Sequence, residues 1–176
     1  MKIMIRREPI GSFGSGHVWL EAWSESENDA YVPANSSSGK ITAIKLDYYG
    51  VSDPASHSRL LKLNEKPTVN EDYNNIILES DVLFSEFYKK LAASDFRSGY
   101  TFNMYKSNCV DSVIFALNAA NIKLNFKKDR SCKYLICCFF AYTSFTKPVE
   151  VLEAARAYKK TINNENSPLL PQVMQK

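Results

Sequence analysis

The chain of 176 residues has no apolar run close to the roughly 20 residues that a membrane-spanning helix needs. Its basic start, Met1–Arg7, is followed by Glu8 and Pro9, where a signal peptide would carry its apolar core, so we expect no export signal. The chain also lacks a large excess of charge of either sign. The net charge is only +3, with lysines and arginines spread along the chain, and this predicts no nucleic-acid partner.

Cysteine is scarce and unsuited by its spacing to a structural role. Three of the four cysteines crowd into the segment 132–138; the four are Cys109, Cys132, Cys137 and Cys138. This spacing fits neither a disulfide framework nor a paired Cys-x-x-Cys zinc signature. We therefore expect reduced thiols in a cytosol-like compartment, and no metal or other cofactor.

Histidine is scarcer still, since the chain has only His17 and His57. His57 ends the turn-like segment Asp53–His57. His17 follows a Gly-Ser-Gly turn and begins an apolar segment with two tryptophans, so we expect it close to the core. The commoner fate of a lone histidine there is a hydrogen-bonded structural role.

Segments with strand character cluster before residue 65, and helical segments follow residue 79, which predicts an α+β fold. We expect a small antiparallel sheet packed against a cysteine-bearing helix. Residues 1–161 should form one domain, followed by a flexible tail at 162–176. The expected strands are 1–8 at an edge, 17–23, 41–49 and 58–63; the expected helices are 80–93 (capped by Ser80), 109–120 and 148–160.

The helix predicted at 109–120 begins at a cysteine. Asn108 is a good cap residue, and Asp111 stands three positions later, as in a capping box, which places Cys109 at the first helical position. The partial positive charge of a helix N-terminus favours a thiolate, and its backbone N–H groups suit an oxyanion. The alternative interpretation is a small buried residue at a helix start, and chain order alone does not separate the two.

A cysteine nucleophile needs an imidazole, and the imidazole is usually oriented by a third group. If the strands at 17–23 and 39–49 pair antiparallel, loop symmetry places His17 opposite about residues 45–47, which makes Asp47 the expected acceptor. A slip of one residue would turn Asp47 to the other face and leave it a solvated strand-end carboxylate. The competing residues are Glu21 (on the same face but about 7 Å further along), Asn28 and Asp29.

Two motifs carry a resemblance to a known family. Gly16-His17 precedes an apolar-aromatic strand, and much later Asn108-Cys109 begins a helix that closes with Ala120-Asn121-Ile122. Over residues 14–122 this order resembles the circularly permuted NlpC-type branch of papain-like hydrolases, which includes lecithin:retinol acyltransferase-like proteins and many bacterial effectors. The resemblance implies a papain-like fold, with Cys109 as nucleophile and His17 as base.

Members of that branch cleave amides, deamidate glutamine or transfer acyl groups through an acyl-cysteine intermediate. We therefore expect a cysteine hydrolase or acyltransferase that acts on a protein or peptide with Cys109, His17 and Asp47. The resemblance implies an effector-like protein, cytoplasmic or delivered into another cell by a specialised secretion system. A peptidoglycan peptide is the competing substrate, and oligomeric state is left open.

The alternative prediction is a non-catalytic module on the same fold. The basic segment 127–133 and the apolar segment 134–145 would then contact a partner protein or a membrane surface. Periodicity does not decide whether 134–145 is a strand, a helix or a membrane-touching surface. Palmitoylation of Cys137 or Cys138 is a third reading of that segment.

Overall fold

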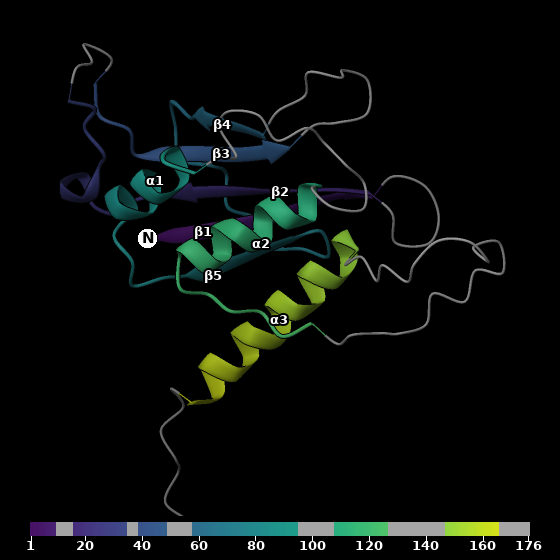
Figure 1. Ribbon diagram of the computed structural model, residues 1–176. Helices are drawn as coiled ribbons and strands as arrows, with labels where there is room; N and C mark the ends of the chain where they lie inside the picture. The colour runs from purple at the N-terminus through teal and green to yellow at the C-terminus, as the bar shows by residue number, and fades with distance from the viewer. Residues whose placement is uncertain (10–15, 35–38, 49–57, 95–107, 127–146, 166–176) are drawn as a thin grey trace, which may run out of the picture.

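The computed structural model describes residues 1–9, 16–34, 39–48, 58–94, 108–126 and 147–165. Within them the chain forms an α+β fold of one antiparallel sheet and three α-helices (Figure 1), which confirms the predicted fold class at that level. The strands are β1 (Lys2–Pro9), β2 (Gly16–Trp23), β3 (Ala43–Tyr48), β4 (Ser58–Lys62) and β5 (Asn75–Glu79). The helices are the short 3-10 helix η1 (Glu27–Asp29) and the α-helices α1 (Phe84–Ala92), α2 (Cys109–Ala119) and α3 (Pro148–Glu165).

The five strands lie in the order β4-β3-β2-β1-β5, and every neighbouring pair is antiparallel. The expected edge position of the first strand is wrong. β1 pairs with β2 on one side and with β5 on the other, because the segment Asn75–Glu79, which was not expected as a strand, adds to its outer edge. Ile3, Met4 and Ile5 are all fully buried, as in a strand covered on both faces.

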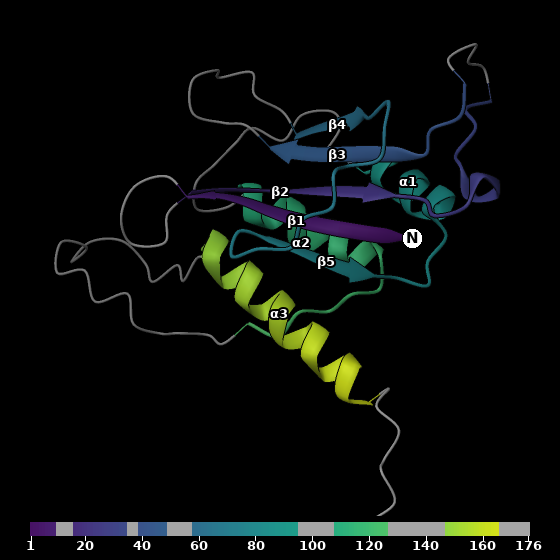
Figure 2. The same cartoon turned by 180° about the vertical axis from the view of Figure 1, so that it is seen from behind.

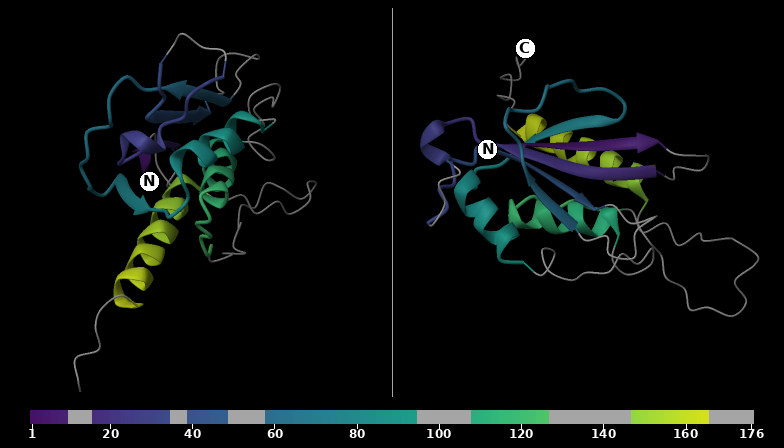
Figure 3. Two further views of the ribbon diagram at one scale, coloured as in Figure 1. Left: turned by 90° about the vertical axis from the view of Figure 1, so that its left-hand side faces the viewer. Right: turned by 90° about the horizontal axis from the view of Figure 1, so that it is seen from above.

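One face of the sheet carries the core. Alternate residues of β2, namely Val18, Leu20 and Ala22, are buried in a cluster shared with the helices. Figure 3 shows α2 lying along this face, and in Figure 2, seen from behind, the strands lie in front of α2. α2 packs mainly on β2 and β3, while α3 packs on β5, β1 and β2.

The start of α1 differs from its prediction. The helix begins at Phe84, and Ser80 does not cap it; the Ser80 hydroxyl donates instead to the backbone oxygen of Ala120 at 2.8 Å. The carboxylate of Asp29 accepts from the backbone N–H of Phe84 at 2.7 Å and of Ser85 at 3.3 Å. The N-terminus of α1 is therefore capped by the distant carboxylate of Asp29 and not by the nearby hydroxyl of Ser80.

The other two helices begin where they were expected. α2 begins at Cys109 and closes at Asn121, whose positive φ of 59° is the left-handed conformation that asparagine tolerates. α3 begins at Pro148 but continues to Glu165, so residues 162–165 are helical and do not belong to a flexible tail. Residues 166–176 lie outside the described residues, as does the apolar segment 134–145.

Candidate active site

The structure brings Cys109, His17 and Asp47 together. The Nε2–H of His17 donates to Oδ1 of Asp47 at 2.6 Å, and the Cys109 side chain lies near enough to the His17 ring to raise its pKa. Because Asp47 takes Nε2, Nδ1 is the ring nitrogen that remains for the thiol. The imidazole therefore lies between a carboxylate and a thiol, which is the arrangement of a cysteine nucleophile with an oriented partner.

The sheet opens at the point where these residues meet. β2 pairs with β1 as far as Gly16, but it pairs with β3 only from Trp23↔Ala43 to Leu20↔Leu46. Beyond Leu20 the ends of β2 and β3 are no longer joined to each other. The imidazole of His17 lies at this unpaired end, where the N-terminus of α2 also reaches the sheet.

The register between β2 and β3 differs by two residues from the expected one. One step beyond Leu20↔Leu46, Asp47 lies opposite Trp19, and it is therefore a diagonal neighbour of His17. A shift of two residues preserves the face of each side chain, whereas a shift of one would reverse it. This is why Asp47 still reaches His17.

Lys45 fixes the second oxygen of the carboxylate. Its Nζ lies 2.6 Å from Oδ2 of Asp47, and both side chains are largely shielded from solvent. Burial of Asp47 acts to raise its pKa, but the hydrogen bonds from His17 and Lys45 outweigh burial and hold that pKa below its ordinary value of 3.8. Asp47 is thus an anion with both oxygens held.

The electrostatics of His17 follow from its two neighbours. Burial of the ring disfavours its charged form, but the hydrogen bond with Asp47 and the interaction with the Cys109 side chain outweigh burial. The charges of both groups add to this effect, and the pKa of His17 rises from 6.5 to about 9. At neutral pH the ring is therefore an imidazolium.

Trp19 completes the surroundings of the imidazole. Its ring stacks on the His17 ring with centroids 5.7 Å apart, and Nζ of Lys45 lies 4.9 Å from the centroid of a Trp19 ring. Sequence reasoning missed the parts played by Lys45 and Trp19. The alternation of strands held the signal, because Trp19 stands two residues after His17 and Lys45 two residues before Asp47, each on the same face.

The competing acceptors are engaged elsewhere. Glu21 accepts from Nε of Arg6 at 2.9 Å and from the indole N–H of Trp19 at 3.0 Å. Asp29 caps α1, as described above, and Asn28 lies within η1, where its backbone N–H donates to the hydroxyl of Ser26 at 3.2 Å. None of these three residues is placed to orient His17.

The first turn of α2 is built as the sequence predicts. Oδ1 of Asn108 accepts from the backbone N–H of Val110 at 2.8 Å and of Asp111 at 3.2 Å, while Oδ2 of Asp111 accepts from the N–H of Asn108 at 3.0 Å. Cys109 is the first residue of the helix and is buried. The cap uses the N–H groups of Val110 and Asp111, so these two are not the free donors that an oxyanion would need. The backbone N–H of Cys109 itself is the donor of that turn which the cap leaves unused.

Other residues singled out in the sequence lie outside the described part of the chain: His57, Cys132, Cys137, Cys138 and the segment 127–146. In the part that is described, no group of three or more histidine, cysteine, aspartate or glutamate side chains is arranged to hold a metal ion. No described helix is both long and apolar enough to cross a bilayer.

Comparisons with protein-family models, with curated proteins and with solved structures find no match for this chain. The geometry of the described residues is therefore what a proposal about its function has to stand on.

Proposed function

We propose that the protein is a cysteine hydrolase or acyltransferase in which Cys109 is the nucleophile, His17 the proton carrier and Asp47 the residue that orients it. The observation that carries the proposal is the shared imidazole: His17 bonds to Asp47 at 2.6 Å, and the Cys109 side chain at the start of α2 lies near enough to raise the pKa of the ring. A structural histidine needs neither a thiol partner nor a carboxylate that is itself fixed by a lysine.

The first chemical step uses the thiolate form of Cys109. An imidazolium beside the sulfur and the N-terminal end of α2 both stabilise that form. The sulfur attacks the carbonyl carbon of an amide or ester, a C–S bond forms, and the carbonyl electron pair moves to oxygen. The backbone N–H of Cys109 is suited to donate to that oxygen.

The second step releases the leaving group. The tetrahedral intermediate collapses, the C–N or C–O bond breaks, and His17 gives its proton to the departing amine or alcohol. An acyl-cysteine remains. Water, or another nucleophile in a transferase, then loses its proton to the neutral His17 as it attacks the thioester, which frees the Cys109 thiolate.

The substrate class that fits best is a protein or peptide amide, with a peptidoglycan peptide as the competing substrate. The antiparallel sheet with a cysteine-bearing helix supports a papain-like domain of the permuted NlpC type, because the histidine strand precedes the cysteine helix in the chain. In keeping with that group, we propose that the protein works inside a cell, its own or one into which it is delivered.

Incubation with muropeptides in one arm and with host-cell lysate in the other tests this proposal by mass spectrometry. Wild type is compared with Cys109→Ala and with Cys132→Ala as the matched control. We expect a product in the lysate that depends on Cys109 and not on Cys132. A muropeptide cut that depends on Cys109 would change the substrate to peptidoglycan. If neither arm gives a Cys109-dependent product, the chain is a binding module.

A further inference from the structure

Arg7 is a buried cation whose side chain has no partner in the described part of the chain. It is 9% exposed, and it follows Ile3 and Ile5 in the alternation of β1, so it lies on the face of the sheet that the helices cover. Its Nε is buried and makes no hydrogen bond, and neither ion pair nor hydrogen bond to its side chain occurs among the described residues. A guanidinium does not lose its charge in a protein, so a buried one without a counter-charge is costly.

The neighbouring arginine shows the usual solution. Arg6, on the opposite face of β1, donates from Nε to Glu21 at 2.9 Å and from Nη2 to the backbone oxygen of Thr68 at 3.0 Å. Arg6 is thus paired within the protein, whereas no described residue pairs with the side chain of Arg7. This contrast between adjacent residues of one type leaves a place for an anion at Arg7 that no described residue fills.

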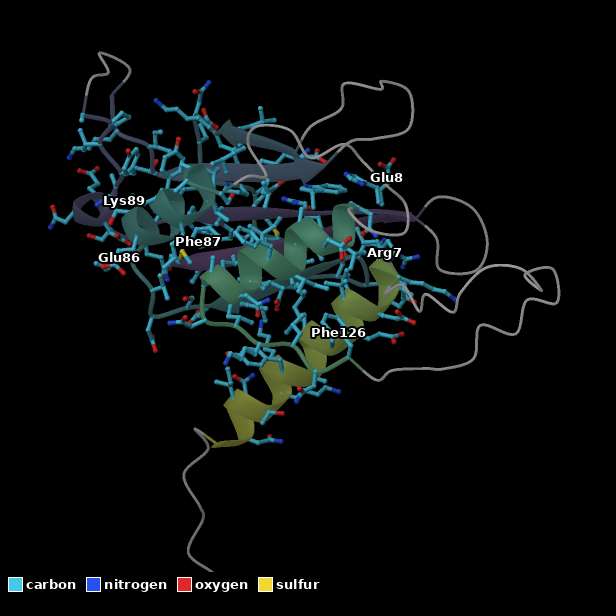
Figure 4. The ribbon with its side chains drawn as sticks, viewed as in Figure 1. Arg7, Glu8, Glu86, Phe87, Lys89 and Phe126 are labelled. Atoms are coloured by element: carbon cyan, nitrogen blue, oxygen red, sulfur yellow. The ribbon has the colours of Figure 1, made fainter. Side chains whose placement is uncertain are left out.

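Arg7 lies at the same end of the sheet as the candidate active site. The β1–β2 register pairs it with Val18, the residue next to His17, and Val18 and Cys109 belong to one buried cluster. α3 also packs on β1, and Figure 4 labels Arg7 at the N-terminal end of α3. The guanidinium and the N-terminus of α2 are therefore two positive features on one side of the sheet.

A second polar atom beside Arg7, in Asn74, also has no partner among the residues that the structure describes. The backbone N–H of Arg7 donates to the backbone oxygen of Asn74 at 2.9 Å, and the side-chain Oδ1 of Asn74 is buried without a hydrogen bond. Rotation of that amide exchanges its oxygen and nitrogen, which would present an N–H donor next to the guanidinium. Arginine with an adjacent amide N–H is a donor set suited to a carboxylate.

We propose that Arg7 forms an anion subsite that binds a carboxylate of the substrate while Cys109 attacks a nearby carbonyl. This inference rests on the proposed function and narrows it, because it makes the preferred acyl donor an acidic one. The carboxylate belongs either to an aspartate or glutamate side chain or to the C-terminus of a peptide, and both present the same planar pair of oxygens to the guanidinium.

Two maleimides of matched size and different charge test the subsite: 3-maleimidopropionate, which carries a carboxylate, and neutral N-propylmaleimide. Both add to the Cys109 thiol, and the ratio of their rates measures preference for the anion. We expect Arg7→Gln to lower this ratio by about tenfold, the order expected for losing a hydrogen bond between charged groups. Lys2→Gln, which removes a cation at the other end of β1, is the control and should change it little.

The neutral reagent separates this inference from the proposed function. If Cys109 reacts with N-propylmaleimide in a His17-dependent way but the ratio is the same in wild type and Arg7→Gln, the subsite is rejected while the thiol–imidazole pair stands. That result would make Arg7 and Asn74 a structural pair.

A test on the wild-type protein avoids the question of whether Arg7→Gln folds. Added succinate should slow the reaction with 3-maleimidopropionate and leave that with N-propylmaleimide unchanged. Equal effects on both reagents, or none on either, would overturn the subsite. To identify the source of the carboxylate, a peptide with a C-terminal carboxylate and an internal glutamate-containing peptide amide can replace succinate.

Discussion

The protonation state of His17 is the property on which the proposed chemistry depends. Its ring is held by Asp47 on one nitrogen, and Asp47 is held in turn by Lys45. The pKa of about 9 means that the folded protein keeps a proton on the ring at neutral pH, when an unfolded chain would have begun to lose it at 6.5. The proton that the proposed mechanism gives to a leaving group is thus already on the ring.

This shift makes stability depend on pH in a definite direction. Because the folded pKa of His17 lies above the unfolded one, its stabilising contribution is complete below pH 6.5 and is lost as pH rises to about 9. The pKa of Asp47 is lowered, so its contribution is present above the ordinary value of 3.8 and is lost on acidification.

We predict that His17→Ala flattens the fall in unfolding free energy between pH 6.5 and 9, measured as urea midpoints across that range. His57→Ala, the matched control for the other histidine, should leave the fall intact. An equal slope in wild type and His17→Ala would show that the ring of His17 has no raised pKa.

At the scale of the element, helix ends that depend on local residues could be predicted from the sequence, whereas a helix end that depends on a distant residue could not. The start of α2 and its close at Asn121 were predictable, because a capping box and a left-handed asparagine act within a few residues of the helix ends. The start of α1 was not, because its cap is Asp29, 55 residues away along the chain. A cap from another element leaves no trace in local sequence.

The sheet shows the same division. The short run Asn75–Glu79 becomes a strand by pairing with β1, and that pairing is a tertiary property. The face of Asp47 was predicted correctly although the register was two residues out, since strand periodicity fixes the face and not the partner. Lys45 and Trp19 were missed although alternation within each strand already places them on the faces of Asp47 and His17.

The capping box of α2 is the element-scale feature that positions Cys109, the proposed nucleophile. We predict that Asn108→Ala destabilises the protein by about 1 kcal/mol, the usual cost of an N-cap deletion. The reaction of Cys109 with a small electrophile should slow as well, because the helix start is no longer fixed. Urea unfolding and labelling kinetics measure the two effects.

Two matched variants make this cap experiment specific. Asn108→Asp retains a capping oxygen and should keep most of the stability. Asn118→Ala, at an exposed position of the same helix, should not destabilise it. If Asn108→Ala costs no more than Asn118→Ala, the cap does not hold the start of α2.

At the scale of the whole molecule, the candidate site lies where three elements that are distant in sequence converge. The end of β2 supplies His17, the end of β3 supplies Asp47, and the start of α2 supplies Cys109. Each of these three elements is anchored by buried residues in the core on the helix-covered face of the sheet. The helix cap, the strand position of His17 and the resemblance to papain-like hydrolases suggested the proposed roles of Cys109 and His17, while the contact of His17 with Asp47 and the burial of Arg7 emerge from the assembled fold.

The most direct test of the central claim, that Cys109 and His17 form a reactive pair, is the rate at which iodoacetamide alkylates each cysteine near neutral pH, resolved by peptide mass spectrometry. In the wild type we predict that Cys109 reacts fastest of the four. In His17→Ala its rate should fall by about tenfold or more, a modest share of what an activating partner contributes, whereas His57→Ala should leave it unchanged. A faster reaction at Cys132, Cys137 or Cys138, or a Cys109 rate indifferent to His17→Ala, would contradict the account.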